Sequence, residues 1–274
     1  MKADDFKLMR VSIERQVAWV TIDYPPINLM DPTLRTEFNA LVPYLAESPD
    51  FKVVVFQSAN PEFFIAHGDL KVIGPQKSEL GISASQAMRE LLRTMPKVTI
   101  AKIEGRARGG GAETALAMDM RFAARGRAIL SQPEVMLGLV PPGTATQRLP
   151  RLMGRSRALE ILLGCEDFDA DLAERYGYIN RALDADEIGP FVDRLATRIA
   201  SFPTETLALT KKAVLSAEYG VMEGLQQESI CSNENHKHGH FVRRRDIFLG
   251  AGGQTREGEL DLAAWADRLS ESSP

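Results

Sequence analysis

Two glutamates among apolar neighbours are the residues of this sequence best suited to chemistry. Glu113 follows three consecutive glycines in the stretch GRARGGGAETALAMD, and Glu134 follows a proline in SQPEVMLGLVPPG. Each alone is more simply explained as a residue of a first helical turn, where the helix dipole favours a negative charge. Two such carboxylates near strand ends, beside backbone groups that can bind an anion, suit acid–base catalysis next to a carbonyl group.

The three glycines predict a backbone site for an anion. A helix is expected to begin near Gly111, and its first N–H groups lack partners inside the helix. Glycine also lets a ligand oxygen approach closely because it has no Cβ. Gly110 is therefore a candidate donor, and Gly68, at another strand-to-helix junction, is a candidate second donor to the same oxygen. A phosphate loop fits less well, since Thr114 stands where G-x-G-x-x-G requires its last glycine.

The elements that must position these residues alternate between strands and helices. Val11–Asp23 alternates in polarity, which predicts a hairpin or two short strands, and Phe51–Ser58 is an apolar run typical of a strand buried on both faces. Helices are expected over Ser83–Met95 and from Gly111 to about Met118. Further strands are expected in KVTIAKIEG and in MRFAARGRAILSQPE. This alternation predicts an α/β core.

From about Leu149 the sequence becomes mainly helical, with only short breaks. We therefore expect a mixed α/β core over residues 1–200 and a helical C-terminal segment over residues 201–274. No repeat of fixed period and no long low-complexity linker interrupts this organisation.

Composition and charge argue against several function classes. The 274 residues carry a formal net charge of -4, and 44% of them are hydrophobic, as in an ordinary globular protein. The basic run Arg243–Arg245 is too short to indicate a nucleic-acid site, and no apolar stretch approaches the roughly 18 residues of a membrane helix. Cys165 and Cys231 form no metal-ligand pattern, and the first ten residues do not resemble a secretory signal. We expect a cytoplasmic protein without metal, nucleic-acid or membrane partners.

Three short motifs follow one another along the chain. The first is AHGDLK at Ala66–Lys71, the second is EGRARGGGAE at Glu104–Glu113, and the third is QPEVMLGLVP at Gln132–Pro141. In order and spacing they resemble the motifs A-G-A-D-L/I-K, N-G-x-A-x-G-G-G-x-E and Q-P-E-x-x-L-G-x-x-P of the enoyl-CoA hydratase/isomerase family, also called the crotonase superfamily. The following TQRLPRLMG fits as well, and the resemblance covers most of the chain.

The resemblance implies a crotonase-like spiral of β-β-α units, whose C-terminal helices build a homotrimer or a dimer of trimers. Family members bind acyl-CoA thioesters and stabilise an enolate-like oxygen with two backbone N–H groups, which correspond to Gly68 and Gly110. In hydratases two glutamates hold the added water, and they correspond to Glu113 and Glu134. The sequence does not say which of them is the acid. Coenzyme A is part of the substrate, and no separate cofactor is implied. The remaining residues of the first motif are expected at the substrate: Ala66, His67, Asp69, Leu70 and Lys71.

The sequence departs from the family pattern at several positions. His67 replaces the usual glycine and Gly68 the usual alanine, an exchange that keeps a backbone N–H. We expect a structural or solvent-facing His67, with proton donation or a CoA contact as the alternative. Pro142 replaces the first glycine of P-G-A-G-G-T-Q and removes an N–H near the expected water. Arg106 and Arg108 are expected in a solvated loop, the alternative being contacts with CoA phosphates or an acidic acyl group.

The leading function is an enoyl-CoA hydratase, because Glu113 and Glu134 occur together. An isomerase, a decarboxylase, a thioester hydrolase or a carbon–carbon lyase on the same scaffold is the second hypothesis, motivated by the departures from the pattern. A CoA-binding protein without turnover is the third, and the presence of both glutamates argues against it. The sequence does not identify the acyl chain.

Overall fold

The structure, a computed structural model, describes residues 3–72 and 83–218, together with residues 237–239, 243, 246, 247 and 250. The chain divides into two compact units, Met1–Ala196 and Thr197–Pro274. The first unit carries both sheets, and the second includes helix α8 (Thr204–Leu215). Most of the C-terminal segment that was expected to build a trimer lies outside the described residues, as does Cys231.

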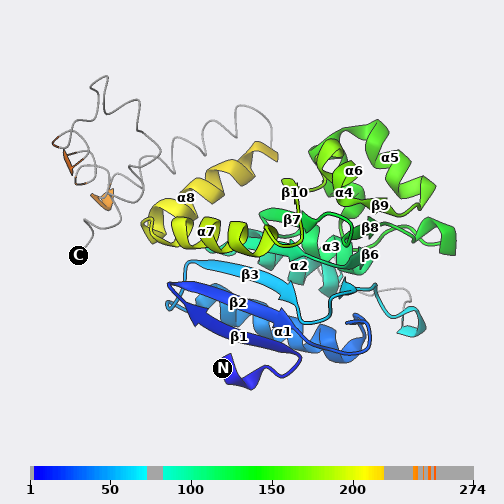
Figure 1. Cartoon of the computed structure of the whole chain (residues 1–274), viewed down its shortest axis with the longest axis horizontal. Helices are drawn as coiled ribbons and strands as arrows, with labels where there is room; N and C mark the ends of the chain where they lie inside the picture. Colours follow the sequence, from blue (N-terminus) through cyan, green and yellow to red (C-terminus); the bar gives the residue numbers. More distant parts are fainter. Residues whose placement is uncertain are drawn as a thin grey trace. The chain divides into compact units, whose positions relative to one another are not determined.

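The larger sheet has six strands, in the spatial order β1 (Met9–Glu14), β2 (Val17–Ile22), β3 (Val53–Ser58), β5 (Val98–Ile103), β7 (Met120–Ala124) and β10 (Arg181–Leu183). The first two strands form an antiparallel hairpin, and the others are added in parallel. Figure 1 shows β1, β2 and β3 side by side. The whole run Val53–Phe56 is buried, which confirms the predicted strand covered on both faces.

The smaller sheet has four strands, in the order β4 (Phe63–Ile65), β6 (Arg106–Arg108), β8 (Ile129–Ser131) and β9 (Phe168–Asp169). The first three are parallel, and β9 is antiparallel to β8. Each of β4, β6 and β8 directly follows a strand of the larger sheet along the chain and is followed by a helix. The chain is therefore built from repeated β-β-α units, as predicted for the fold class.

The helices begin and end where local chemistry favours it. Helix α1 starts with a proline after Asp31, whose Oδ1 accepts a hydrogen bond from the N–H of Leu34 at 2.9 Å. Helix α2 starts with a capping box between Ser83 and Gln86. The helices of the first unit are α1 (Pro32–Glu47), α2 (Ala84–Thr94), α3 (Gly110–Leu116), α4 (Ala145–Met153), α5 (Arg155–Gly164) and α6 (Ala170–Tyr176), and α7 (Ile188–Ala200) spans the division between the units.

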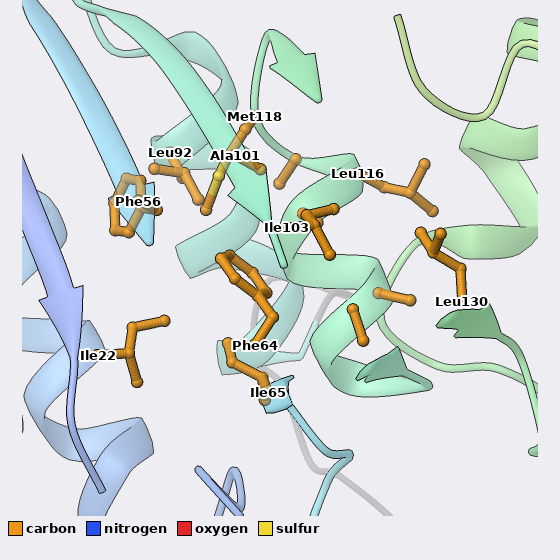
Figure 2. Close-up of a cluster of buried hydrophobic side chains, with 14 of the residues drawn as sticks. Ile22, Phe56, Phe64, Ile65, Leu92, Ala101, Ile103, Leu116, Met118 and Leu130 are labelled. Carbon is orange, nitrogen blue, oxygen red and sulfur yellow. The ribbon is translucent and has the colours of Figure 1, made fainter. Parts of the chain in front are cut away.

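The hydrophobic core joins the two sheets to α2 and α3. Figure 2 shows side chains from β3, β4, β5 and these two helices gathered in one cluster, with Phe64 near its centre. Phe56, Phe64 and Ile103 are fully buried, and Leu116 is 3% exposed. Burial of one such side chain contributes about 2 kcal/mol. The core thus fixes β4 and α3, the two elements that precede and contain the candidate site residues.

Candidate active site

Gly68 and Gly110, the two expected oxyanion donors, lie close together. Gly68 follows β4, and Gly110 begins α3 shortly after β6. Because β4 and β6 pair in parallel, with Ile65 opposite Ala107, the residues that follow both strands emerge at the same end of the sheet. A Cβ added to Gly110 would lie 3.5 Å from the backbone nitrogen of Gly68. The structure therefore brings both residues to one small region.

The neighbouring glycines each have a structural reason of their own. Gly109 has a φ of 47°, a conformation that favours glycine, and a Cβ there would lie 2.8 Å from Oε1 of Glu134. A Cβ on Gly111 would lie only 2.2 Å from the carbonyl oxygen of Ile65. Close contact between α3 and β4 therefore requires glycine at this position.

A buried asparagine holds the loop beneath Gly68. Asn28 is fully buried, and its Oδ1 accepts a hydrogen bond from the N–H of Tyr24 at 2.8 Å. Its Nδ2 lies within hydrogen-bond distance of Oγ of Ser58 and of the carbonyl oxygens of Phe63 and Phe64. The side chain thus ties the loop before α1 to the start of β4. The sequence analysis missed this residue, whose only signal is an asparagine within an otherwise apolar turn.

The first motif is attached to the same loop. The N–H of Met30 donates to the carbonyl oxygen of His67 at 2.9 Å, and Met30 forms a parallel bridge with Gly68. Nδ1 of His67 lies 2.8 Å from the carbonyl oxygen of Gly68. Since a carbonyl oxygen only accepts, Nδ1 carries the proton. His67 therefore helps to orient the peptide group that follows Gly68.

The other residues of the first motif differ in exposure. Ala66 is buried, and the side chain of Asp69 accepts a hydrogen bond from the N–H of Lys71 at 3.0 Å. Leu70 is 50% exposed, and Lys71 is exposed as well. The chain places all four next to Gly68, and their contact with substrate stays a prediction.

Glu113 lies on α3 and is almost completely buried, with 2% of its surface exposed. Its Oε1 accepts hydrogen bonds from the backbone N–H groups of Gly143 at 2.8 Å and of Ala145 at 3.2 Å. A Cβ on Gly143 would lie 2.0 Å from Oε2 of Glu113. Any larger residue at position 143 would therefore displace the Glu113 carboxyl group, a constraint that arises from tertiary contact and that the sequence analysis did not anticipate.

Pro142 does not remove a hydrogen bond from Glu113. The proline is exposed, and both backbone donors to the carboxylate come from residues that follow it, Gly143 and Ala145. Its lack of an N–H therefore leaves the support of Glu113 intact.

Glu134 is the second buried carboxyl group, 8% exposed, and it immediately precedes a short helical turn (Val135–Leu137). Burial and the nearby charge of Glu113 raise the pKa of Glu134 to about 7. Its Oε2 is buried without a hydrogen-bond partner among the described residues. Its Oε1 faces Gly109, as the 2.8 Å distance to a Cβ there indicates. The four residues singled out by the sequence, two glycines and two glutamates, thus belong to one site.

Arg89 of α2 also belongs to this site, although the sequence analysis did not single it out. The side chain is 97% buried, since only 3% of the residue is exposed. Its Nη2 donates to the carbonyl oxygen of Gly110 at 2.9 Å. Burial lowers the pKa of Arg89, and the negative charge of Glu113 acts in the opposite direction. The signal in the sequence is an arginine one turn before Leu92 on the apolar side of a helix.

Arg106 and Arg108 lie on strand β6, which corrects the expected loop. The strand has only three residues, too few to form a recognisable pattern, and only Ala107 between the arginines is buried. Nε of Arg108 donates to Oδ1 of Asp167 at 2.7 Å. The guanidinium of Arg106 lies 5.8 Å from the ring centre of Phe63. Both arginines therefore have structural contacts within the chain.

Among the residues that the structure describes, no cluster of three His, Cys, Asp or Glu side chains could hold a metal ion. Within the same residues, no helix combines the length and the apolar character needed to cross a membrane.

Comparison with known proteins identifies the family. The family model described as Enoyl-CoA hydratase/isomerase matches residues 12–247, which is most of the chain. The chain belongs to this family. The match confirms the resemblance that the three motifs predicted, and with it the crotonase-like class of the fold.

Solved structures agree over nearly the full length. A Streptomyces avermitilis protein described as a candidate enoyl-CoA hydratase is 34% identical, with 98% of each chain covered and a TM-score of 0.72. An enoyl-CoA hydratase subunit of Geobacillus kaustophilus is 28% identical over 92% of this chain and 98% of its own, with a TM-score of 0.83. An enoyl-CoA hydratase of Bacillus anthracis, 24% identical over 92% of this chain and 100% of its own, has a TM-score of 0.81 and supports the fold.

Proposed function

We propose that this member of the enoyl-CoA hydratase/isomerase family is an enoyl-CoA hydratase, which adds water across the double bond of a 2-enoyl-CoA. The proposal rests on the proximity of two buried carboxyl groups to a pair of backbone donors. The carboxyl groups belong to Glu113 and Glu134, and the donors to Gly68 and Gly110. An isomerisation needs one carboxyl group to move a proton, whereas a hydration needs one group for the water and a second for the carbon.

The backbone N–H groups of Gly68 and Gly110 would bind the thioester oxygen of the substrate. When hydroxide adds to Cβ, the electrons of the double bond move toward this oxygen and create an enolate. Two preformed donors stabilise that charge without reorganisation, and loss of one such donor typically costs about 3 kcal/mol of transition-state stabilisation. The proximity of the two glycines supports this role.

The environments of the two glutamates support different roles. The backbone N–H groups of Gly143 and Ala145 donate to Oε1 of Glu113 and hold its carboxyl group in place, where it would take a proton from water as the oxygen attacks Cβ. Glu134, with a pKa raised to about 7, holds a proton in a large fraction of molecules at neutral pH and would deliver it to Cα. The product is a 3-hydroxyacyl-CoA, and exchange of protons with solvent restores both groups.

An isomerase on the same scaffold is the second candidate. Oε2 of Glu134 is buried and unpaired among the described residues, so this one carboxyl group could move a proton between two carbons of a 3-enoyl-CoA. Decarboxylation, thioester hydrolysis and CoA binding without turnover have no specific observation in their favour.

A direct assay separates these functions. Crotonyl-CoA and longer 2-enoyl-CoAs are incubated with the protein, and the loss of enoyl absorbance is followed together with the mass of the product. A hydratase adds one water to the acyl-CoA, whereas an isomerase converts a 3-enoyl-CoA without a change of mass. The double variant Glu113→Gln/Glu134→Gln is the control for contaminating activity. If no 2-enoyl-CoA of any length gains water, or if the double variant is as active as the wild type, the hydratase assignment is wrong.

We also propose the assembly and location that the resemblance implies, a homotrimer or dimer of trimers in the cytoplasm with acyl-CoA as its small-molecule partner. Light scattering on the full-length protein measures the mass of the assembly. A monomer at micromolar concentration would contradict the proposed assembly.

A further inference from the structure

We propose that Arg89 is a positioning residue of the active site, which fixes Gly110 and supplies the positive charge that balances the two glutamates. The effect on turnover rests on the proposed hydratase function, whereas the effect on the glutamates does not. Nothing in the three motifs includes this residue, which lies on α2 between the first and second motifs.

The hydrogen bonds of Arg89 link α2 to the start of α3. Its Nη2 donates to the carbonyl oxygen of Gly110 at 2.9 Å and lies 3.2 Å from Oγ1 of Thr114. The hydroxyl of Thr114 also donates to that carbonyl oxygen, at 2.8 Å. On the other side, Nη1 donates to the hydroxyl of Ser85, one turn earlier on α2. Two donors therefore fix the peptide group directly after the N–H expected to bind the thioester oxygen.

The same guanidinium lies near the carboxylate of Glu113, although the two groups form no direct ion pair. A Cβ on Gly143 would lie 2.0 Å from Oε2 of Glu113 and 2.7 Å from Nη1 of Arg89, so both side chains border the same backbone segment. A Cβ on Gly110 would lie 3.5 Å from Nη2 of Arg89 as well as from the nitrogen of Gly68. Arg89 thus neighbours both Gly110 and the carboxyl group of Glu113.

A structural role alone does not explain why the charged side chain of Arg89 is buried. Arg89 makes no direct ion pair among the described residues, and its Nε is buried without a hydrogen-bond partner there. Burial of a cation without a paired anion is unfavourable, and apolar residues of similar volume often replace buried charges with a gain in stability. The anions that offset this charge are the two glutamates of the site.

Several other groups shape the charge balance around Arg89. The positive charges of Arg35 (α1) and Arg148 (α4) lower the pKa of Arg89. The negative charges of Glu113 and Glu134 raise it. In return Arg89 lowers the pKa of Glu134, opposing the effects of burial and of Glu113. Burial raises the pKa of Tyr178, and the charges of both glutamates act weakly in the same direction. Loss of the charge at position 89 should therefore shift the titration of Glu134 to higher pH.

The experiment compares Arg89→Met and Arg89→Lys with Arg157→Met, which changes an exposed arginine of α5 in the same way. Turnover of crotonyl-CoA is measured from pH 5 to 9, and the titration of Glu134 is followed by NMR in protein with ¹³C-labelled glutamate carboxyls, assigned with Glu134→Gln. We expect Arg89→Met to lower kcat roughly 10- to 100-fold, because the N–H of Gly110 would no longer be held in position. The change of KM should be smaller. We also expect its Glu134 to titrate at higher pH than in the wild type.

The conservative variant separates charge from geometry. Arg89→Lys keeps the charge, so its Glu134 should titrate near the wild-type pH, while its kcat stays below that of the wild type because lysine cannot reproduce the planar contacts of arginine. Thr114→Val removes one donor to the carbonyl of Gly110 and leaves the charge. It should lower kcat without moving the titration of Glu134, and if Arg89→Met does not fold it tests the positioning of Gly110 by itself.

Two results would overturn the inference. One is a folded Arg89→Met protein with wild-type kcat, and the other is a Glu134 titration that is the same in Arg89→Met, Arg89→Lys and the wild type. If the wild type hydrates no enoyl-CoA but its Glu134 titration shifts in Arg89→Met, the proposed function fails and the charge balance stands.

Discussion

The carboxylate of Glu113 accepts a hydrogen bond from the backbone N–H of Gly143 at 2.8 Å, although the two residues are 30 positions apart in the sequence. The contact joins α3 to the segment that leads into α4, and the N–H of Ala145 adds a second hydrogen bond to the same oxygen. These two backbone donors therefore fix the position of the Glu113 carboxyl group.

The Gly143→Ala variant should lose both activity and stability. The added methyl group would lie 2.0 Å from Oε2 of Glu113 and 2.7 Å from Nη1 of Arg89, so both side chains must move. We expect at least a tenfold loss of turnover and a cost in stability of about 1–3 kcal/mol, as for other overpacked sites. Chemical denaturation and the crotonyl-CoA assay measure the two effects. Gly164→Ala on α5 is the control, since no atom lies within 4 Å of a Cβ there, and it should be active and no less stable than the wild type.

The single variants Glu113→Gln and Glu134→Gln should each lower kcat roughly 100-fold or more, because each removes a proton acceptor or donor and keeps the shape of the side chain. In the wild type, kcat/KM for hydration should decline as the pH rises through about 7, where Glu134 loses the proton that it delivers. Initial rates from pH 5 to 9 measure this profile. Wild-type rates in either variant would remove that glutamate from the mechanism.

The stability of the protein should depend on pH through Glu134. Its pKa is about 7 in the folded chain and 4.5 when unperturbed, so the folded state holds this proton more tightly than the unfolded state. The resulting stabilisation is fully present below about pH 4.5 and is lost as the pH rises through about 7, a change on the order of 2–3 kcal/mol.

Glu134→Gln removes this dependence, since glutamine does not titrate. Relative to the wild type, the variant should therefore become more stable as the pH increases from 5 to 8, by up to several degrees in Tm. Thermal unfolding of both proteins at matched pH values tests the prediction. A stability difference that does not change with pH would show that Glu134 titrates normally in the folded protein.

Substitution of Asn28 should destabilise the protein strongly, because this buried side chain makes several hydrogen bonds. Asn28→Leu would remove the hydrogen bonds to Ser58, Phe63 and Phe64 and leave a buried carbonyl oxygen without its side-chain partner. We expect a cost of about 2–4 kcal/mol in denaturant unfolding. Asn39→Leu, at an exposed position of α1, should change stability by less than about 1 kcal/mol. Equal effects of the two substitutions would contradict the anchoring role of Asn28.

Local patterns predicted the parts of the molecule that local physics determines. Alternating polarity predicted β1 and β2, an apolar run predicted β3, and helical spacing predicted α2. The site residues Gly68, Gly110, Glu113 and Glu134 were found because three motifs keep their order and spacing.

The features that the sequence did not predict depend on contacts between segments that are distant in the chain. Strand β6 has three residues and two arginines, so its pattern is too short and too polar to indicate a strand. Arg89 stands on the buried face of α2, but its partner Gly110 lies 21 positions away, so no local pattern connects the two. The need for glycine at 143 comes from a side chain of α3, which no local pattern at that position could reveal.

The parallel strands β4, β6 and β8 each lead into one component of the site, Gly68, Gly110 and Glu134 respectively. Their spacing is therefore set by the hydrogen-bond repeat of a small sheet, which side chains elsewhere in the protein do not alter. Substitutions in the surrounding helices and loops can thus change the walls of the site while Gly68, Gly110 and Glu134 keep their spacing.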